Sequence, residues 1–190
     1  MHTFLHNVHQ YLRTFPQDQQ RLNQLKRFLE CNSNIYDRKN VNGHIVANAL
    51  VINPKGQVLT LFHNTLQMYL QPGGHVESKD TSLEKTAQRE AEEESGIVGL
   101  KLHPWHIDHA IPLLIESHWM PENPQKEEPA HMHHDVLYIF IAESSNIQLQ
   151  AEEVSDFSWN SPSEIMSYNP DSFPGQALQR MRYLRLLDRD

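Results

Sequence analysis

Three glutamates in the acidic stretch from Arg89 to Ile97 have the types and the spacing that metal-assisted chemistry requires. On a helix, which turns about 100° per residue, Glu90 and Glu94 fall inside the apolar stripe that contains Leu83, and Glu93 flanks them. Two carboxylates about 6 Å apart in a half-buried groove repel each other by roughly 3 kcal/mol at an effective dielectric constant near 20. Such a pair needs a cation, and all-oxygen ligation is typical of Mg²⁺ or Mn²⁺.

The alternative for any acidic run is a solvated helix face without a ligand. Glu92 is expected to point to that wet face, because it lies opposite the apolar stripe. Charge alone does not separate the two interpretations. The placement of Glu90 and Glu94 within the apolar stripe favours the metal site.

The stretch from Gly74 to Ile97 resembles the Nudix box, in which a glycine, a glutamate and an Arg-Glu-aliphatic-x-Glu-Glu-x-Gly-aliphatic run follow at fixed spacing. The match is close from Arg89 to Ile97, with Ala91 in the first aliphatic position. The first half departs from the pattern at Asp80, which stands in place of the first glutamate. Eight residues instead of seven separate Asp80 from Arg89.

The resemblance implies an α/β fold, a Nudix-like α/β/α sandwich with a mixed β-sheet. It also implies an enzyme, a Nudix-type pyrophosphohydrolase that uses Mg²⁺ or Mn²⁺ to cleave a diphosphate linkage in a nucleoside diphosphate linked to another moiety. Glu90 and Glu94 would be the principal metal ligands, Glu93 a further ligand or a residue that orients metal-bound water, and the Gly74 carbonyl would complete the coordination. Arg89 would orient these carboxylates.

The spacing of the residues does not identify which carboxylate would accept the proton of the attacking water. Glu93 and Glu94 lie within the box, and the family often uses a glutamate outside it. The available residues outside the box are Glu116, Glu127, Glu128, Glu152 and Glu153.

Other classes of function are weighed against the hydrolase. A non-catalytic Nudix-like nucleotide-binding or regulatory module would keep the fold without turnover. An isomerase of isopentenyl diphosphate, known in a relative of the fold, calls for a catalytic cysteine in the core, and Cys31 lies in the N-terminal helices as an expected small buried residue. An RNA-decapping enzyme would favour a basic groove, which this acidic chain does not indicate.

A second candidate site lies in residues 117–135, which are interpreted as a long loop that borders the substrate or makes a solvated excursion. Its last residues, His131, His133 and Asp135, alternate, so on an extended strand they share one face. They could bind zinc or another transition metal, but hydrogen-bonded histidines in a polar pocket wall are preferred, because no cysteine or clear fourth ligand is evident. Some Nudix subfamilies resemble the chain in this Pro-x-His-x-His-x-Asp run, which hints at substrate recognition. Trp119 is expected to pack on the domain rather than to stack on a base.

The elements that position these residues follow from periodicity and turn residues. Helices are expected over 3–14, after Pro16, from a Thr81–Glu84 capping box to Gly96, from Pro162, and over 176–187. Strands are expected over 44–52, 57–63, 100–102, 107–116, 136–143 and 157–159, with a turn at 53–56. We divide the chain into an N-terminal helical hairpin, residues 1–34, and a Nudix domain, residues 35–190. The hairpin could cover the sheet, form a homodimer contact or help to close the substrate site.

Composition limits the partners. The 190 residues include 16 basic and 24 acidic side chains, a net charge of −8, which argues against a nucleic-acid polymer or an anionic membrane surface. No stretch approaches the roughly 20 apolar residues of a membrane span, and the single cysteine suits a reducing compartment. A cytoplasmic protein with a small-molecule diphosphate substrate is the expectation.

Overall fold

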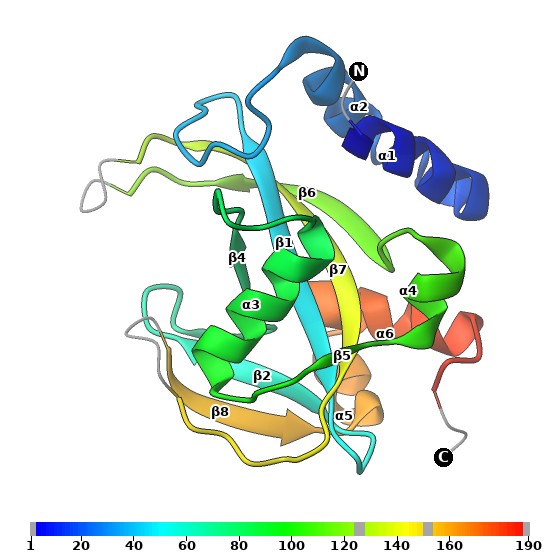
Figure 1. Cartoon of the computed structure of the whole chain (residues 1–190), viewed down its shortest axis with the longest axis vertical. Coiled ribbons are helices and arrows are strands. Elements are labelled where there is room, and N and C mark those ends of the chain that lie inside the picture. Colours follow the sequence, from blue (N-terminus) through cyan, green and yellow to red (C-terminus); the bar gives the residue numbers. More distant parts are fainter. Residues whose placement is uncertain (1–2, 124–127, 150–153, 188–190) are drawn as a thin grey trace.

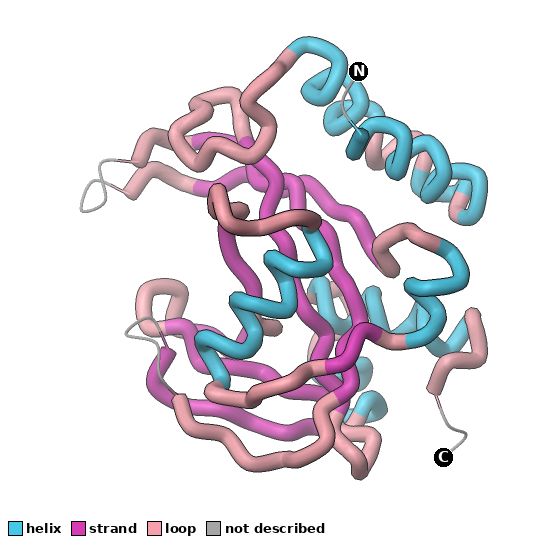
Figure 2. Tube along the Cα trace, in the orientation of Figure 1, coloured by secondary structure: helices cyan, strands magenta, loops and turns pink. Residues whose placement is uncertain are grey.

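The computed structural model describes residues 3–123, 128–149 and 154–187. A mixed eight-stranded sheet lies at its centre, with α3 in front of it and α5 and α6 behind it (Figures 1 and 2). The strands are β1 (His44–Ile52), β2 (Val58–His63), β3 (Met68–Leu70), β4 (Gly73–His75), β5 (Lys101–Leu102), β6 (Leu114–Met120), β7 (His131–Ile141) and β8 (Val154–Asn160). The helices are α1 (Thr3–Thr14), α2 (Asn23–Cys31), α3 (Leu83–Ser95), α4 (Pro104–His109), α5 (Pro162–Tyr168) and α6 (Phe173–Tyr183). This is the predicted α/β/α sandwich.

The centre of the sheet is a parallel pair, β1 with β7, in which His44 lies opposite His133 and Ile52 opposite Ile141. The other pairs are antiparallel, and β1 also pairs with the short β4, where Ala47 lies opposite Gly74. Strand β1 is buried along almost its whole length, as its near-continuous apolar sequence predicts. The sheet therefore brings residues from distant parts of the sequence to one place.

Helix α3 ends where the sequence predicts, at Gly96 in the left-handed conformation with φ 70°. The predicted Thr81–Glu84 capping box is wrong, because Ser82 is the residue before the helix and its side chain makes no cap. Thr86 anchors the first turn instead, donating its hydroxyl to Asp80 and to the Ser82 carbonyl. The start of α3 thus depends on Asp80.

The N-terminal helices cover the sheet. Phe28 of α2 lies against the His134 ring, at 4.6 Å between centroids, on the face away from His133. The carboxylate of Asp18, between α1 and α2, accepts hydrogen bonds from Tyr11 and from Arg180 of α6. Buried apolar residues of α1 and α2 belong to the same core as the sheet. Covering the sheet, one of the three predicted roles, is therefore what these helices do.

The expected strand over 107–116 is wrong in its first half. Pro104 at the first helical position and the His103 side chain, which accepts from the Trp105 N–H, start α4 instead. Ala110, with φ 54°, ends this helix, and β6 begins only at Leu114. Helix formation also gives His106 two backbone partners that a strand would not.

The predicted loop over 117–135 is shorter than expected. Residues 117–120 and 131–135 pair as β6 and β7, with His118 opposite His133. The polarity of both segments made them look unlike strands, but one of their faces lines a polar cavity. Strand β7 consequently begins five residues before the expected start at Val136 and ends at Ile141 rather than Glu143.

The remaining expected turn, strand and helices are present with small shifts of boundary. Residues 53–56 turn between β1 and β2, with Gly56 at φ 74°, and β8 runs into α5, which begins with a Ser161–Glu164 capping box. Helix α6 ends at Tyr183, earlier than predicted. Cys31 is exposed at the end of α2, so its expected burial is wrong. In the described part of the chain, no helix has both the length and the apolar character needed to cross a membrane.

Candidate active site

The turn from β4 into the loop before α3 brings two glutamates of the helix against two glycines of the strand. Glu94 accepts a hydrogen bond from the Gly73 N–H at 3.2 Å. The carboxylate of Glu90 lies so close to Gly74 that a Cβ there would be 2.4 Å from its Cδ. Only glycine leaves room for a carboxylate at this point.

Burial changes the ionisation of Glu90. Its side chain is 17% exposed, and burial raises its pKa, while the neighbouring Arg89 guanidinium opposes the rise. A half-buried carboxylate of this kind is stabilised by a cation. The oxygen donors gathered here are the carboxylates of Glu90 and Glu94, and such donors fit Mg²⁺ or Mn²⁺.

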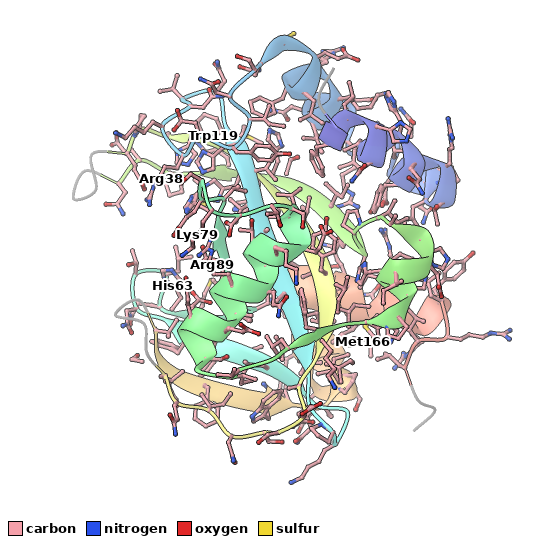
Figure 3. All side chains as sticks on the ribbon, in the orientation of Figure 1. Arg38, His63, Lys79, Arg89, Trp119 and Met166 are labelled. Atoms are coloured by element: carbon pink, nitrogen blue, oxygen red, sulfur yellow. The ribbon has the colours of Figure 1, made fainter. Side chains whose placement is uncertain are left out.

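Arg89 holds the surrounding acids in place. Its guanidinium donates to both oxygens of Asp80, at 3.0 and 2.9 Å, and to the His75 carbonyl at 2.9 Å. It also lies 2.9 Å from Glu90 and 2.8 Å from Glu93. Figure 3 shows Arg89 and Lys79 beside each other next to α3. These contacts are the ones that an orienting residue needs.

Glu93 and Glu92 differ from Glu90 and Glu94. The side chain of Glu93 is 51% exposed and bound by Arg89 and Lys79. Glu92 does not point to solvent as expected, since it accepts hydrogen bonds from the Gly99 and Leu100 N–H groups and fixes the chain beyond the helix. Within the acidic run, Glu90 and Glu94 thus lie against the glycines, Glu92 stabilises the fold, and Glu93 lies at the exposed edge.

A cavity of about 1490 Å³ lies next to these residues, on the face of the sheet opposite α3, and reaches α5 and α6. The box contributes Glu90, Glu94, Gly73 and Gly74 to its lining among the described residues. Apolar side chains of β2 and β3, Arg38 and the start of α6 line other parts of it. The volume is sufficient for a nucleotide-sized molecule.

His131, His133 and Asp135 lie on one face of β7, as their alternation predicts, and all three line this cavity. Asp135 accepts a hydrogen bond from Asn48 at 2.9 Å. Its Oδ2 atom lies 2.8 Å from the His118 Nδ1 atom, and the carboxylate raises the pKa of His118. His134 points to the other face, where it bonds with Ser117. The cavity wall is therefore polar on this side.

Two residues that contact the polar cavity wall, the buried His44 and the lining residue Asn48, carry no signal in the sequence. His44 lies beside His133 only because β1 pairs in parallel with β7. Asn48 links Asp135 to Gln71 by hydrogen bonds of 2.9 and 3.0 Å. Nothing in the spacing of these residues indicates such contacts, since strand pairing determines them.

Of the five glutamates outside the box that were considered as proton acceptors, two lie at the cavity. Glu116 and Glu128 line the cavity, whereas Glu127, Glu152 and Glu153 lie outside the described residues. Trp119 is 61% exposed, so its expected packing on the domain is wrong. Residues 120–123 and Glu128 border the cavity, as one interpretation of the loop has it.

Comparisons with known proteins agree with this geometry. A family model described as NUDIX domain matches residues 43–181, while no curated protein matches the chain. Among solved structures, an Ap4A hydrolase of C. elegans in a binary complex is 16% identical, with a TM-score of 0.53 over 75% of this chain and 97% of that one. A hydrolase of the NUDIX family from Clostridium perfringens is 21% identical, with a TM-score of 0.54 over 74% and 97%. The NUDIX domain of Shewanella oneidensis NrtR, complexed with ADP ribose, is 19% identical, with a TM-score of 0.50 over 84% and 97%. At these identities the structures show that the fold is shared.

Proposed function

The chain belongs to the Nudix family, and from that membership and the geometry of Glu90 and Glu94 we propose that it is a divalent-metal-dependent pyrophosphohydrolase. Its substrate is a nucleoside diphosphate linked to another moiety, and the bond that breaks is the diphosphate linkage. The observation that carries the proposal is the pair of half-buried carboxylates packed against Gly73 and Gly74 at the edge of a large cavity.

The residues present fit Mg²⁺ or Mn²⁺. Glu90, Glu94 and the Gly74 carbonyl would hold the ion, and Glu93 would orient water at the outer edge. When bound, such an ion stabilises negative charge on phosphate oxygens and makes a coordinated water more acidic. The absence of a side chain at residue 74 keeps Glu90 at the strand, and the raised pKa of Glu90 agrees with a carboxylate that a cation stabilises.

Arg89 positions the carboxylates for this role. It bridges Asp80, the His75 carbonyl and Glu90, and so ties α3 to the strand that carries the glycines. Fixing the two elements relative to each other keeps the carboxylates preorganised, which lowers the reorganisation that the reaction requires. The positive charge of Arg89 also partly offsets the repulsion among the acids.

The cavity supplies the remaining functions. Arg38, which pairs with Glu128, lies in its lining and is suitable for a phosphate or ribose contact. Apolar side chains of β2 and β3 are suitable for the base or the linked group. Glu116 and Glu128 are the described glutamates outside the box that could accept the proton of the attacking water. The polar wall that His131, His133 and Asp135 form on β7 would also contact the substrate.

A substrate panel tests the proposal. The chain is incubated with ADP-ribose, dinucleoside polyphosphates, nucleotide sugars, NADH and nucleoside triphosphates, each with Mg²⁺, with Mn²⁺ and with a chelator, and the products are separated by chromatography. We expect at least one linked nucleoside diphosphate to be cleaved at the diphosphate in a metal-dependent manner. Binding of these compounds without any cleavage would instead support the non-catalytic module.

A further inference from the structure

Histidines from four strands crowd together at one end of the sheet in the described structure. They are His44 of β1, His75 of β4, His118 of β6, and His131 and His133 of β7. The His44 ring lies 4.6 to 4.9 Å from the rings of His75, His131 and His133. His131 and His133 are 4.9 Å apart by the same measure. The pairing of β1 with β7 and of β1 with β4 produces this cluster.

Three of these side chains present nitrogens close enough to share one ion. Ligand atoms of His44, His131 and His133 all lie within 4.8 Å of one another. In a tetrahedral zinc site the nitrogens lie about 3.4 Å apart, because each Zn–N bond measures about 2.0–2.1 Å. Small side-chain rotations would bring the nitrogens from separations of up to 4.8 Å to the separation that zinc requires. The group contains no carboxylate, so its chemistry differs from that of Glu90 and Glu94.

The nitrogens of this group lack partners that burial would otherwise require. His44 is 1% exposed, and neither of its ring nitrogens has a hydrogen-bond partner among the described residues. The Nε2 atom of His131 is also buried without a partner there. A buried polar atom left unsatisfied costs about 1–3 kcal/mol. A ligand that engages these atoms would remove the cost.

The hydrogen bond of His131 fixes which of its nitrogens is available. Its Nδ1 lies 2.6 Å from the Pro129 carbonyl, which can only accept, so Nδ1 carries the proton and donates. The lone pair therefore lies on Nε2, the atom without a partner. Histidines that bind metal ions commonly donate their other nitrogen to a backbone carbonyl in this way.

Burial favours the neutral form of His44 and His133, the form that binds metal ions. Burial, reinforced by neighbouring imidazoles, lowers the pKa of His44 to about 3 and that of His133 to about 2. A neutral cluster could also serve as a stacked wall for a substrate ring. That interpretation leaves both nitrogens of His44 unsatisfied, because the face of a ring offers them no hydrogen bond, so the metal site explains more of the observations.

We propose that His44, His131 and His133 form a zinc-binding site, separate from the carboxylates of the Nudix box. Three imidazole nitrogens suit Zn²⁺ and do not suit Mg²⁺. His131 and His133 line the cavity, so the proposed ion would lie at its border. A zinc site with three histidines and one open position can take a water molecule or an anionic group of a ligand in the cavity.

Direct metal binding tests the site without relying on activity. The untagged chain, freed of metal with a chelator, is titrated with Zn²⁺ by calorimetry, and bound metal is counted by elemental analysis after dialysis against excess Mg²⁺. We expect one zinc ion per chain that Mg²⁺ does not displace. Absence of stoichiometric zinc under these conditions would overturn the proposal.

Variants locate the zinc. His131→Gln and His133→Gln should each weaken zinc binding by about 100-fold or more, whereas His63→Gln, at another cavity residue, should bind as the wild type does. Glu94→Gln should also bind zinc normally, which separates this site from the proposed catalytic one. Loss of zinc from Glu94→Gln but not from His131→Gln would place the ion at the carboxylates and refute the inference.

Folding of the variants is checked independently. His44 is buried, so His44→Gln is interpreted only if its thermal unfolding without metal matches the wild type. Zinc should raise the melting temperature of the wild type and of His63→Gln but not of His131→Gln. An equal rise in all three proteins would contradict a site built from His131.

Discussion

The guanidinium of Arg89 and the carboxylate of Asp80 form a two-point ion pair, with Nε–Oδ1 and Nη2–Oδ2 distances of 3.0 and 2.9 Å. Asp80 stands where the Nudix box has its first glutamate, and one extra residue separates it from Arg89. The shorter side chain still reaches the arginine, because the Glu77 N–H and the Thr86 hydroxyl hold it near the start of α3. The departure from the box therefore preserves a structural contact.

Asp80→Asn should lower the free energy of unfolding at pH 7 by about 2 kcal/mol, a typical value for a hydrogen-bonded charge. The bonds from Arg89, the largest effect, lower the pKa of Asp80 to about 2, against the opposing effect of burial. The stabilisation is complete at pH values well above 3.8, the ordinary pKa of an aspartate, and is lost as the pH falls toward 2. Urea unfolding at pH 7 and pH 3 measures it. A variant equally destabilised at both values would contradict the ion pair.

Glu94→Gln should abolish metal-dependent hydrolysis, with a loss of about 1000-fold or more in kcat, and leave the fold intact. Glutamine keeps an oxygen for the Gly73 N–H but removes the charge that would hold the ion. Steady-state assays with Mg²⁺ and Mn²⁺ measure the loss, and Glu143→Gln, on the surface in a pair with Lys101, is the control. Undiminished turnover in Glu94→Gln would exclude the proposed role.

Gly74→Ala should raise the Mg²⁺ concentration needed for half-maximal activity by tenfold or more, while the melting temperature falls only slightly. The added Cβ would lie 2.4 to 2.7 Å from the three carboxylate atoms of Glu90 and force the side chain to move. An activation curve against Mg²⁺, compared with thermal unfolding, separates the two effects. An unchanged activation curve would show that activation by Mg²⁺ does not depend on the present position of the Glu90 carboxylate.

His106 should make the fold sensitive to acid. Its Nε2 accepts from the Ile139 N–H and its Nδ1 donates to the Ile111 carbonyl, so a protonated ring would lose the first bond. Burial lowers its pKa from 6.5 to about 4. The unfolded chain therefore binds more protons between these values, and stability falls as the pH drops through this range, by roughly 3 kcal/mol in total for this residue.

The variant His106→Gln tests whether His106 causes the acid sensitivity of the fold. Glutamine does not titrate, so the stability advantage of the wild type over the variant should shrink as the pH falls from 7 to 4.5, measured by urea unfolding. His6→Gln, on the exposed side of α1, should leave the pH profile unchanged. Parallel profiles for wild type and His106→Gln would assign the acid sensitivity to other groups.

Asp18→Ala should cost about 3 kcal/mol or more, because it leaves a buried guanidinium without its partner. The Arg180 Nη2 atom lies 2.8 Å from the carboxylate, and their side chains are 11% and 8% exposed. Chemical denaturation measures the loss, and Asp108→Ala, exposed on α4, should change stability by less than about 0.5 kcal/mol. A small loss in Asp18→Ala would mean that the N-terminal helices do not depend on this ion pair for docking.

The sequence predicts the parts of the site that are close together along the chain. Helical spacing places Glu90 and Glu94 on one face, and alternation places His131, His133 and Asp135 on another, because both patterns depend on local geometry. His44 and Asn48 escape prediction, since their positions depend on which strands pair. The polar ends of β6 and β7 also escape prediction, because a strand that faces a polar cavity lacks the apolar alternation of a core strand.

The ion pair between Asp18 and Arg180 also constrains when the molecule can finish folding. A chain still emerging from the ribosome presents its first two helices long before the segment that carries Arg180 exists. Until residue 180 has been synthesised, Asp18 lacks one of its two guanidinium partners, and β1 cannot pair until β7 has been synthesised. The native structure is therefore completed only after β7 and Arg180 have been translated, and contacts of such long sequence separation make slow folding the expectation.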